Sequence, residues 1–372
     1  RVAHNQFSIY LASKQRLAAN QSGNKECHST ETSLLYTTDE ILKAIDNQKL
    51  TAVVLLDMSK AFDSVNHHIL LSKLQDVGVS LSCLQWFCSY LSNRYQVVRI
   101  NSTVSSPRPV TCGVPQGSIL GPLLFNIYVN DAPTIPQKCS SQSFVDDTKL
   151  YLSFKLKDQS QAITEINQDL TRFRNWCFNN YLLLNTGKSN LMVFGSRQMI
   201  SKLDNFQISL VGKDLNPVNS AKDLGLILDS FLTYDEHVIK TISSCTAILC
   251  QINRVKHVFD RPTLIQIIKS LVFSKLFYCS NVWSNTSQKN IKKLQAIQNF
   301  ACRIVSGKRK FDHISGQLKE LRWLPIATEL EYRNGVMAYK CMSGRAPKYL
   351  ADKFKSRYDI TNRRTRNQEK LQ

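Results

Sequence analysis

Two apolar runs in this chain each lead to aspartate residues, and this pattern limits the fold more than any other feature. Thr51–Leu56 is a continuous series of β-branched and aliphatic residues, which predicts a buried strand that ends at Asp57. Asp146 and Asp147 are predicted to lie at a hairpin turn, because two short strands flank them: Ser141–Val145 and Lys149–Phe154. Asp57 and Asp146 are 89 residues apart, so only folding can unite them. Adjacent strands of one sheet would bring them to a common edge.

Three clustered carboxylates repel one another unless cations neutralise them. Mg²⁺ prefers one or two carboxylates plus substrate phosphates, and a pair of such ions can stabilise both oxygens in phosphoryl transfer. A divalent metal site is therefore one interpretation of the three acids. An aspartate at a strand end is also commonly a turn or cap residue, so spacing alone leaves both roles open.

The charge of the chain predicts a polyanionic partner or a strongly solvated surface. The 372 residues include 48 Lys+Arg and 28 Asp+Glu, for a net charge of +20 and a hydrophobic fraction of 43%, which excludes an acidic disordered chain. The length favours two or three compact units. Residues 229–372 hold 26 basic and 11 acidic side chains, against 22 and 17 in residues 1–228. The C-terminal part is therefore expected to bind the polyanionic partner.

Cysteine usage and hydropathy bear on the compartment. The eleven cysteines are scattered without a C-x-x-C pair or zinc-finger spacing, which favours reduced, buried thiols in an intracellular protein. No apolar run reaches the roughly 18–20 residues of a membrane helix, because Gly121-Pro122 and Asn126 interrupt the richest stretch. We expect no membrane partner. No signal peptide is recognisable, and the chain starts at Arg1, so an upstream targeting segment would be missing.

The remaining pattern mixes helices and strands and predicts an α+β fold. A main boundary is expected at Asp229, after which basic helices dominate. Expected helices cover residues 2–19, a segment capped by Thr38-Asp39-Glu40 and ending near Lys49, a segment from about Ser64 to Val77 capped by Asp63, residues 81–91, a segment from Pro122, and residues 161–179. Expected strands are residues 95–100, 107–110, 182–185 and 190–194, with another before Asp223.

Five blocks of the sequence, in order, resemble motifs of reverse transcriptases in the form found in jockey-type non-LTR retrotransposons. They are Leu56–Val65 (LDMSKAFDSV), Gly113–Phe125 (GVPQGSILGPLLF), Phe144–Thr148 (FVDDT), Leu184–Ser189 (LNTGKS) and Asp223–Asp229 (DLGLILD). Leu294–Val305 and Leu321–Pro325 also resemble the region on the C-terminal side of the polymerase in such elements, so the resemblance covers nearly the whole chain.

The resemblance implies a right-hand polymerase: an α+β palm with an antiparallel sheet, partial fingers and a helical thumb. Residues 1–50 would be partial fingers, residues 51–228 the palm with fingers elements, residues 229–305 the helical thumb or connection, and residues 306–372 a basic helical C-terminal extension. The expected endonuclease and part of the fingers would be absent, so the chain would be a fragment of a larger element protein. Gly23-Asn24-Lys25 stands where relatives have Gly-Phe-Arg.

The resemblance also assigns roles to site residues. Asp57 and Asp146 would be the main ligands of two Mg²⁺ ions, for which Mn²⁺ can substitute, and Asp147 would complete the acidic cluster. Phe62 would exclude a 2′-hydroxyl of the incoming nucleotide by steric clash, or else be an ordinary core residue. Gln116 and Gly117 would let the backbone approach the nascent base pair, or else form a simple Gly/Pro turn.

Basic residues receive two further implied roles. Lys188 would lie near the triphosphate as a charge partner or proton donor, or else be a solvent-facing turn lysine. Phosphate contacts on the thumb side would come from Arg303, Lys308, Arg309 and Lys310. His67-His68 is expected on a helix surface, since no third metal ligand is evident.

The implied function is RNA-directed DNA polymerisation, with an RNA template, a DNA primer or nicked target DNA, and dNTP as partners. The alternative is a truncated, catalytically inactive copy that only binds RNA or a hybrid duplex. An RNA-dependent RNA polymerase is disfavoured by Phe62. The nucleus and cytoplasm, as a ribonucleoprotein, are the expected locations, and the sequence makes no prediction of oligomeric state.

Overall fold

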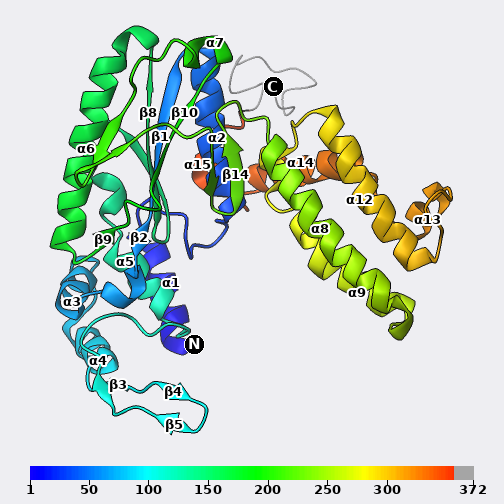
Figure 1. Cartoon of the computed structure of the whole chain (residues 1–372). Helices are drawn as coiled ribbons and strands as arrows, with labels where there is room; N and C mark the ends of the chain where they lie inside the picture. Colours follow the sequence, from blue (N-terminus) through cyan, green and yellow to red (C-terminus); the bar gives the residue numbers. More distant parts are fainter. Residues whose placement is uncertain (356–372) are drawn as a thin grey trace, which may run out of the picture. The chain divides into compact units, whose positions relative to one another are not determined.

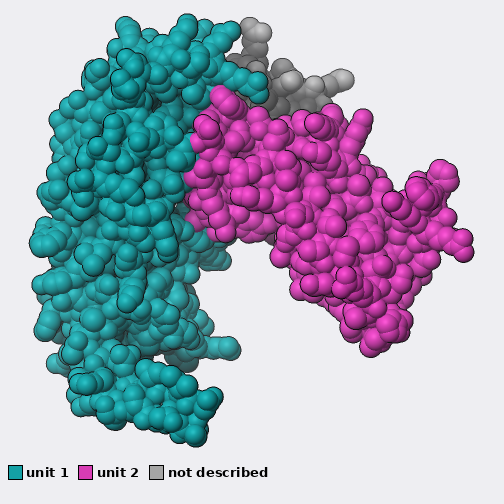
Figure 2. Space-filling model, in the orientation of Figure 1, with its two compact units in different colours: residues 1–28, 41–218 teal, residues 29–40, 219–372 magenta. Residues whose placement is uncertain are grey.

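The computed structural model describes residues 1–355, which form two compact units (Figure 2). Unit 1 consists of residues 1–28 and 41–218, and unit 2 of residues 29–40 together with the chain from Asn219 onward. The division falls at Asn219, before the predicted boundary at Asp229. The last part of the predicted C-terminal extension, residues 356–372, lies outside the described residues.

Unit 1 is built on a four-stranded antiparallel sheet in the order β10-β1-β8-β7 (Figure 1). Its strands are β1 (Leu50–Leu56), β7 (Ser140–Phe144), β8 (Asp147–Phe154) and β10 (Asn190–Phe194). β1 is central and nearly all of it is buried, as the continuous apolar run predicts. Leu56 pairs with Thr148, so the C-terminal end of β1 lies at the same end of the sheet as the β7–β8 turn.

Helices α5 (Gly121–Tyr128) and α6 (Gln159–Asn179) supply much of the core around this sheet. The helix predicted over residues 161–179 is confirmed as α6, and its apolar residues Ile166, Leu170, Phe173, Trp176 and Cys177 are buried. α5 is buried over most of its length and begins with Pro122 in its first turn, as expected of proline at a helix start.

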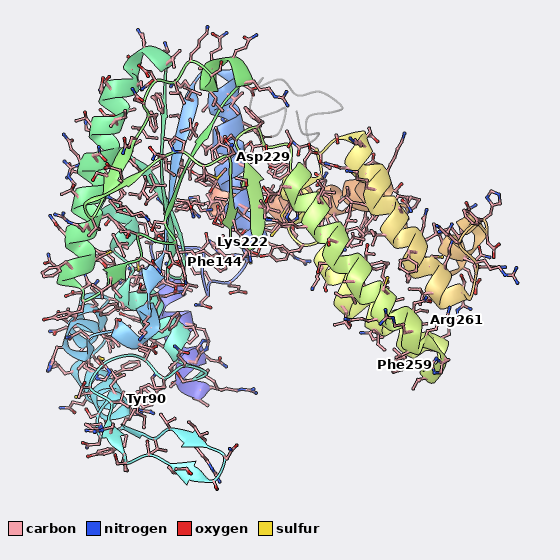
Figure 3. All side chains as sticks on the ribbon, in the orientation of Figure 1. Tyr90, Phe144, Lys222, Asp229, Phe259 and Arg261 are labelled. Atoms are coloured by element: carbon pink, nitrogen blue, oxygen red, sulfur yellow. The ribbon has the colours of Figure 1, made fainter. Side chains whose placement is uncertain are left out.

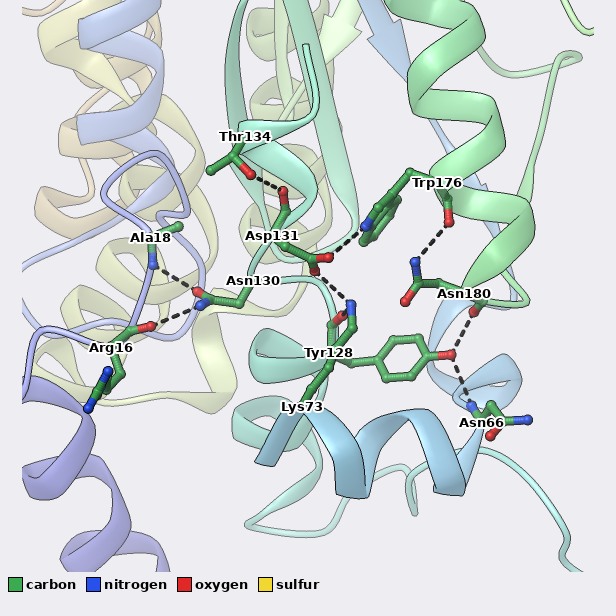
Figure 4. Close-up of polar contacts among 10 residues, drawn as sticks. All are labelled: Arg16, Ala18, Asn66, Lys73, Tyr128, Asn130, Asp131, Thr134, Trp176 and Asn180. Atoms are coloured by element: carbon green, nitrogen blue, oxygen red, sulfur yellow. Dashed lines mark hydrogen bonds and ion pairs between the residues drawn. The ribbon is translucent and has the colours of Figure 1, made fainter. Parts of the chain in front are cut away.

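A polar network at the C-terminal end of α5 joins three helices (Figure 4). The Lys73 ammonium, from α3 (His67–Asp76), donates to the Tyr128 carbonyl and to the Asp131 carboxylate, each at 2.6 Å. Trp176 Nε1 of α6 donates to the other oxygen of Asp131 at 2.8 Å. The Tyr128 hydroxyl donates to the Asn180 carbonyl at 2.6 Å. These bonds fix α3 and α6 against the end of α5.

The N-terminal segment is attached to the same region (Figure 4). The side chain of Asn130 accepts a hydrogen bond from the Ala18 N–H at 2.7 Å and donates to the Arg16 carbonyl at 2.8 Å. Both residues lie just beyond the end of α1 (Val2–Ser13). α1 packs its buried Phe7 and Leu11 into the core of unit 1.

Shorter elements complete unit 1. They are α4 (Leu81–Leu91), α7 (Arg197–Ile200), three short 3₁₀ helices (Ala61–Ser64, Ala132–Thr134, Leu156–Asp158), the pair β2 (Met58–Ser59) and β9 (Leu183–Leu184), the pair β11 (Ile208–Leu210) and β12 (Lys213–Leu215), and an exposed arm formed by β3 (Tyr95–Gln96), β4 (Arg99–Ile100), β5 (Thr103–Val104) and β6 (Arg108–Pro109). The arm covers the predicted strands 95–100 and 107–110, but the turn between them is shorter than the predicted residues 101–106, because Thr103–Val104 pairs with Arg99–Ile100.

The structure corrects two predicted helix starts. α2 (Thr30–Asp46) begins eight residues before Thr38, because Ser29 and Thr32 exchange backbone-to-hydroxyl hydrogen bonds of 2.9 and 3.1 Å. Thr38 instead donates its hydroxyl to the Leu34 carbonyl within the helix.

The second correction concerns Asp63, which does not cap α3. Asn66 is the cap, since its side-chain oxygen accepts from the N–H groups of His68 and Ile69 at 3.0 and 3.2 Å. Asp63 lies three residues earlier, in a 3₁₀ turn, and its carboxylate accepts from the Gln116 side chain at 3.0 Å.

Unit 2 is mostly helical, as predicted beyond Asp229. It begins with the hairpin β13 (Ser220–Asp223) and β14 (Leu226–Asp229), on which Lys222 and Asp229 are labelled in Figure 3. Its helices are α8 (Asp235–Val255), a 3₁₀ turn (Lys256–Val258), α9 (Arg261–Ile268), a π turn (Lys269–Phe273), α10 (Ser274–Leu276), α11 (Ser280–Trp283), α12 (Gln288–Ser306), α13 (Ser315–Glu320), α14 (Ile326–Met342) and α15 (Lys348–Ala351). No helix in residues 1–355 is long and apolar enough to cross a membrane.

Candidate active site

Asp57 and Asp146, predicted to meet at one sheet edge, lie together at the end of β1 and at the β7–β8 turn. Asp57 is the residue between β1 and β2, and both carboxylates are half-buried. Burial raises the pKa of the Asp146 carboxyl, and the charge of Asp57 raises it further, against two backbone N–H groups that lower it. The folded chain therefore holds two like charges within electrostatic reach.

Asp147 occupies a different position from the predicted one. The turn residues are Val145 and Asp146, because Phe144, labelled in Figure 3, pairs with Asp147. Asp147 is thus the first residue of β8, and its side chain is exposed. Within residues 1–355 no group of three or more His, Cys, Asp or Glu side chains could hold a metal ion. A ligand role of Asp147 stays a prediction.

The backbone of Asp57 is held by the turn on the C-terminal side of β9. The Asn185 N–H donates to the Asp57 carbonyl at 2.8 Å, and the Asp57 N–H donates to the Ser189 hydroxyl at 3.3 Å. Ser189 in turn donates to the Asn185 carbonyl at 2.8 Å. The predicted site residue Lys188 is on this turn, with its side chain exposed. The fourth sequence block therefore lies directly against the first.

Phe62 lies five residues beyond Asp57, at the acidic end of β1, and is half-buried. Its ring stacks on Phe125 of α5, with centroids 4.3 Å apart and an interplanar angle of 18°. One face of the Phe62 ring is thus fixed by the core. This arrangement suits a rigid wall of a substrate site, and it equally satisfies a structural aromatic pair.

The loop with Gln116 and Gly117 packs on the segment around Phe62. The Val114 N–H donates to the Phe62 carbonyl at 2.9 Å, and His67 Nε2 lies 2.8 Å from the Gly113 carbonyl. Gly113 has a φ of +85°, and a Cβ there would lie 2.9 Å from the Asp63 carbonyl oxygen, so only glycine fits. Gly117, at a φ of +79°, is exposed and has open space above it.

Of the two histidines predicted on a helix surface, only His68 has the predicted exposure. His68 lies on the exposed helix surface as expected, whereas His67 is half-buried and supports the Gly113 loop.

In unit 2, the predicted phosphate contacts lie at the C-terminal end of α12. Gly307 ends that helix in the left-handed conformation, at a φ of +66°. The next segment, the basic loop Lys308–Phe311, is exposed; Lys310 lies 5.5 Å from the ring centroid of Phe311, which is 88% exposed. Arg303 differs, because it is half-buried and donates to the Asp312 carbonyl at 3.3 Å.

The carboxylate pair fits a divalent cation. Mg²⁺ commonly binds through one or two carboxylates and keeps waters or substrate phosphates as its other ligands, so a cage of three protein ligands is not required. The like charges of Asp57 and Asp146 and the raised pKa of Asp146 are what a cation would relieve. When bound there, Mg²⁺ would polarise phosphate oxygens and activate a hydroxyl group.

Comparison with protein families matches residues 4–228 to Reverse transcriptase (RNA-dependent DNA polymerase). The chain belongs to the reverse transcriptase family. The matched residues include the four-stranded sheet, both Asp57 and Asp146, and the loops around Phe62 and Gly117. The predicted α+β right-hand polymerase fold is thereby confirmed.

Curated relatives confirm the resemblance to non-LTR elements. The chain is 28% identical over 320 residues to "Probable RNA-directed DNA polymerase from transposon BS" of Drosophila melanogaster, which covers 82% of this chain and 34% of the relative. It is 26% identical over 297 residues to "RNA-directed DNA polymerase from mobile element jockey" of the same species, covering 77% and 32%. The chain thus spans about a third of the length of these relatives.

Among solved structures, apo telomerase from Candida Tropicalis is similar with a TM-score of 0.47 and 12% identity. This match covers 88% of this chain and 54% of that chain.

The reverse transcriptase motifs predict Asp57 and Lys188 as site residues, and the structure adds Ser189, which the sequence did not indicate. Its hydroxyl accepts from the Asp57 N–H and donates to the Asn185 carbonyl, although Ser189 and Asp57 are 132 residues apart in the chain. The block Leu184–Ser189 has the composition of an Asx turn, and the side chain of Asn185 does accept from the Gly187 N–H at 3.1 Å. The turn was therefore recognisable from the sequence, but its partner strand was not.

Proposed function

We propose that this chain is an RNA-directed DNA polymerase that transfers a nucleotide from dNTP to a primer 3′-hydroxyl on an RNA template. The observation that carries the proposal is the pair of half-buried carboxylates, Asp57 and Asp146, held at one end of the reverse transcriptase sheet. The names of the relatives support the reaction class.

In the proposed reaction the 3′-hydroxyl oxygen forms a bond to the α-phosphorus of the dNTP. The bond from that phosphorus to the bridging oxygen breaks, pyrophosphate leaves, and the hydroxyl proton passes to water. Asp57 and Asp146 would hold the Mg²⁺ ions, with Asp147 beside them. Lys188, on the turn that holds Asp57, would balance charge on the triphosphate or donate a proton to the departing pyrophosphate.

The remaining site residues would select and position the substrates. Phe62, backed by Phe125, would form the wall that rejects a 2′-hydroxyl. Gln116, tied to Asp63, and the open backbone at Gly117 would lie beside the nascent base pair. Arg303 and the basic loop would contact phosphates without sequence preference.

The test is primer extension with Mg²⁺ on a poly(rA) template and oligo(dT) primer, comparing the chain with Asp146→Asn. We expect extension by the parent chain that the substitution abolishes, while both proteins bind the hybrid equally. The exposed aspartate variant Asp214→Asn is the control and should extend normally. No extension by any of the three proteins, with hybrid binding retained, would overturn the proposal in favour of a binding protein without turnover.

A further inference from the structure

One buried side chain, Gln21, binds the backbone of the turn that carries Asp146. Gln21 is fully buried. Its side-chain oxygen accepts from the Val145 N–H at 2.9 Å, and its side-chain nitrogen donates to the Val145 carbonyl at 3.1 Å. A single amide thus satisfies both backbone polar groups of the residue immediately before Asp146.

Val145 needs such support, because its backbone conformation is unfavourable. Its φ is +60°, in the left-handed region that β-branched residues rarely adopt. Two-residue hairpin turns of this kind normally use glycine or asparagine at such positions. A strained turn persists only where surrounding contacts determine it, and in this turn the Gln21 amide makes two of those contacts.

The segment that carries Gln21 is itself firmly placed beside β7. The Ser22 N–H donates to the Ser143 carbonyl and the Ser143 N–H donates to the Asn20 carbonyl, both at 2.8 Å. A Cβ on Gly23 would lie 2.4 Å from the nearest side-chain carbon of Val145, so the backbone here touches the turn directly. The Gly23 carbonyl also accepts from Asn126 of α5 at 2.6 Å.

We infer that Gln21 is a positioning residue for Asp146: its amide holds the strained Val145 turn so that the Asp146 carboxylate stays beside Asp57 despite their like charges. This inference rests on the proposed function, since it concerns the same carboxylate pair. The Gln21 side-chain oxygen also accepts from the Gly23 N–H at 2.9 Å, and none of these side-chain hydrogen bonds goes to Asp57 or Asp146, so Gln21 would act on the carboxylate pair through the turn.

The experiment uses Gln21→Met, which fills a similar volume but removes both hydrogen bonds to Val145 and the one from the Gly23 N–H. The matched control is Gln142→Met, because Gln142 is also buried and also bonds the same segment, through the Ser22 hydroxyl at 2.8 Å, without touching the turn. Three quantities are measured for each protein: amide hydrogen exchange at residues 144–147, affinity for Mn²⁺ without nucleotide, and primer extension. Should Gln21→Met not fold, Gln21→Asn, one methylene shorter, replaces it under the same criteria.

We expect Gln21→Met to speed exchange of the Val145 and Asp146 amides, to weaken Mn²⁺ binding by about tenfold, and to lower kcat with an unchanged Kd for the template–primer hybrid. Gln142→Met should resemble the parent chain in all three. Unchanged exchange and Mn²⁺ affinity in a folded Gln21 variant would overturn the inference, and so would equal losses in Gln142→Met. If the parent chain neither extends primers nor binds Mn²⁺, the proposed function fails, and amide exchange at the turn still decides the role of Gln21.

Discussion

At the residue scale, the proposed selection of dNTP by Phe62 can be tested against a purely structural role of its ring. Phe62 stacks on Phe125 at 4.3 Å, and only Phe62 is partly exposed. Phe62→Val shortens the wall, so we expect the ratio of kcat/KM for dTTP over UTP to fall by at least about tenfold. Steady-state incorporation of both nucleotides measures it. The control Phe178→Val alters an exposed phenylalanine of α6 and should leave the ratio unchanged.

The buried His237 makes the stability of unit 2 depend on pH. Burial lowers the pKa of His237 to about 4, so between pH 6.5 and 4 the unfolded chain binds a proton that the folded chain does not. The contribution of the neutral His237 to stability is therefore fully present above pH 6.5 and is lost as the pH falls toward 4. We expect about 2 kcal/mol less stability at pH 5 than at pH 7 from this residue.

Urea unfolding of the parent chain and of His237→Gln at both pH values measures this effect. The substitution should remove most of the pH dependence assigned to His237. An identical pH dependence in both proteins would show that other groups cause it.

The position of the carboxylate pair was predictable from the sequence, whereas contacts between residues far apart in the chain were not. Asp57 and Asp146 were predicted to lie together because each follows a predicted strand and belongs to a block that resembles a reverse transcriptase motif. The contact of Gln21 with Val145 was not predicted, because the two residues are 124 positions apart and no local sequence pattern indicates such a pair. The prediction that Asp63 caps α3 was wrong. Any Asp, Asn or Ser near a helix start is a candidate cap, and here the side chain of Asn66 accepts the cap hydrogen bonds.

Two helix caps of unit 1 provide a matched test at the element scale. Asn66 caps α3 with hydrogen bonds to two N–H groups, whereas Ser80 precedes α4 without a side-chain cap bond. Asn66→Ala should lower the free energy of unfolding by about 1 kcal/mol, and Ser80→Ala by much less. Urea denaturation of both variants measures the difference. Equal losses in the two would contradict the assignment of Asn66 as the cap.

β1 and α6 were predictable from the sequence, because the continuous apolar run of β1 and the helically spaced apolar residues of α6 are buried as expected. The start of α2 was not, since Ser and Thr residues can serve either as caps or inside a helix. Ser29 and Thr32 form the cap, and Thr37 and Thr38 bond backward to carbonyls of Ser33 and Leu34. Sequence composition alone does not separate these two uses.

Charge distribution is the feature of the whole molecule that bears on binding. Most of the net charge of +20 belongs to residues 229–372, and the basic loop Lys308–Phe311 presents three cations beside an exposed aromatic ring. Replacing Lys308, Arg309 and Lys310 together by alanine should weaken hybrid binding and reduce the salt slope by up to about 3.

Fluorescence anisotropy at several salt concentrations measures that slope. The control removes three exposed lysines of unit 1, Lys155, Lys157 and Lys202, and should change the slope less. Equal changes in both triple variants would mean that the total charge, and not this loop, governs binding.

We propose Asp57 and Asp146 as the catalytic metal pair, and single-turnover dTTP incorporation against Mg²⁺ concentration tests this role most directly. Asp57→Asn and Asp146→Asn should each lower the rate by more than about 100-fold, with hybrid binding retained. Asp147→Asn should lose less, because Asp147 is exposed at the start of β8. Parent-like incorporation by either Asp57→Asn or Asp146→Asn would contradict the account.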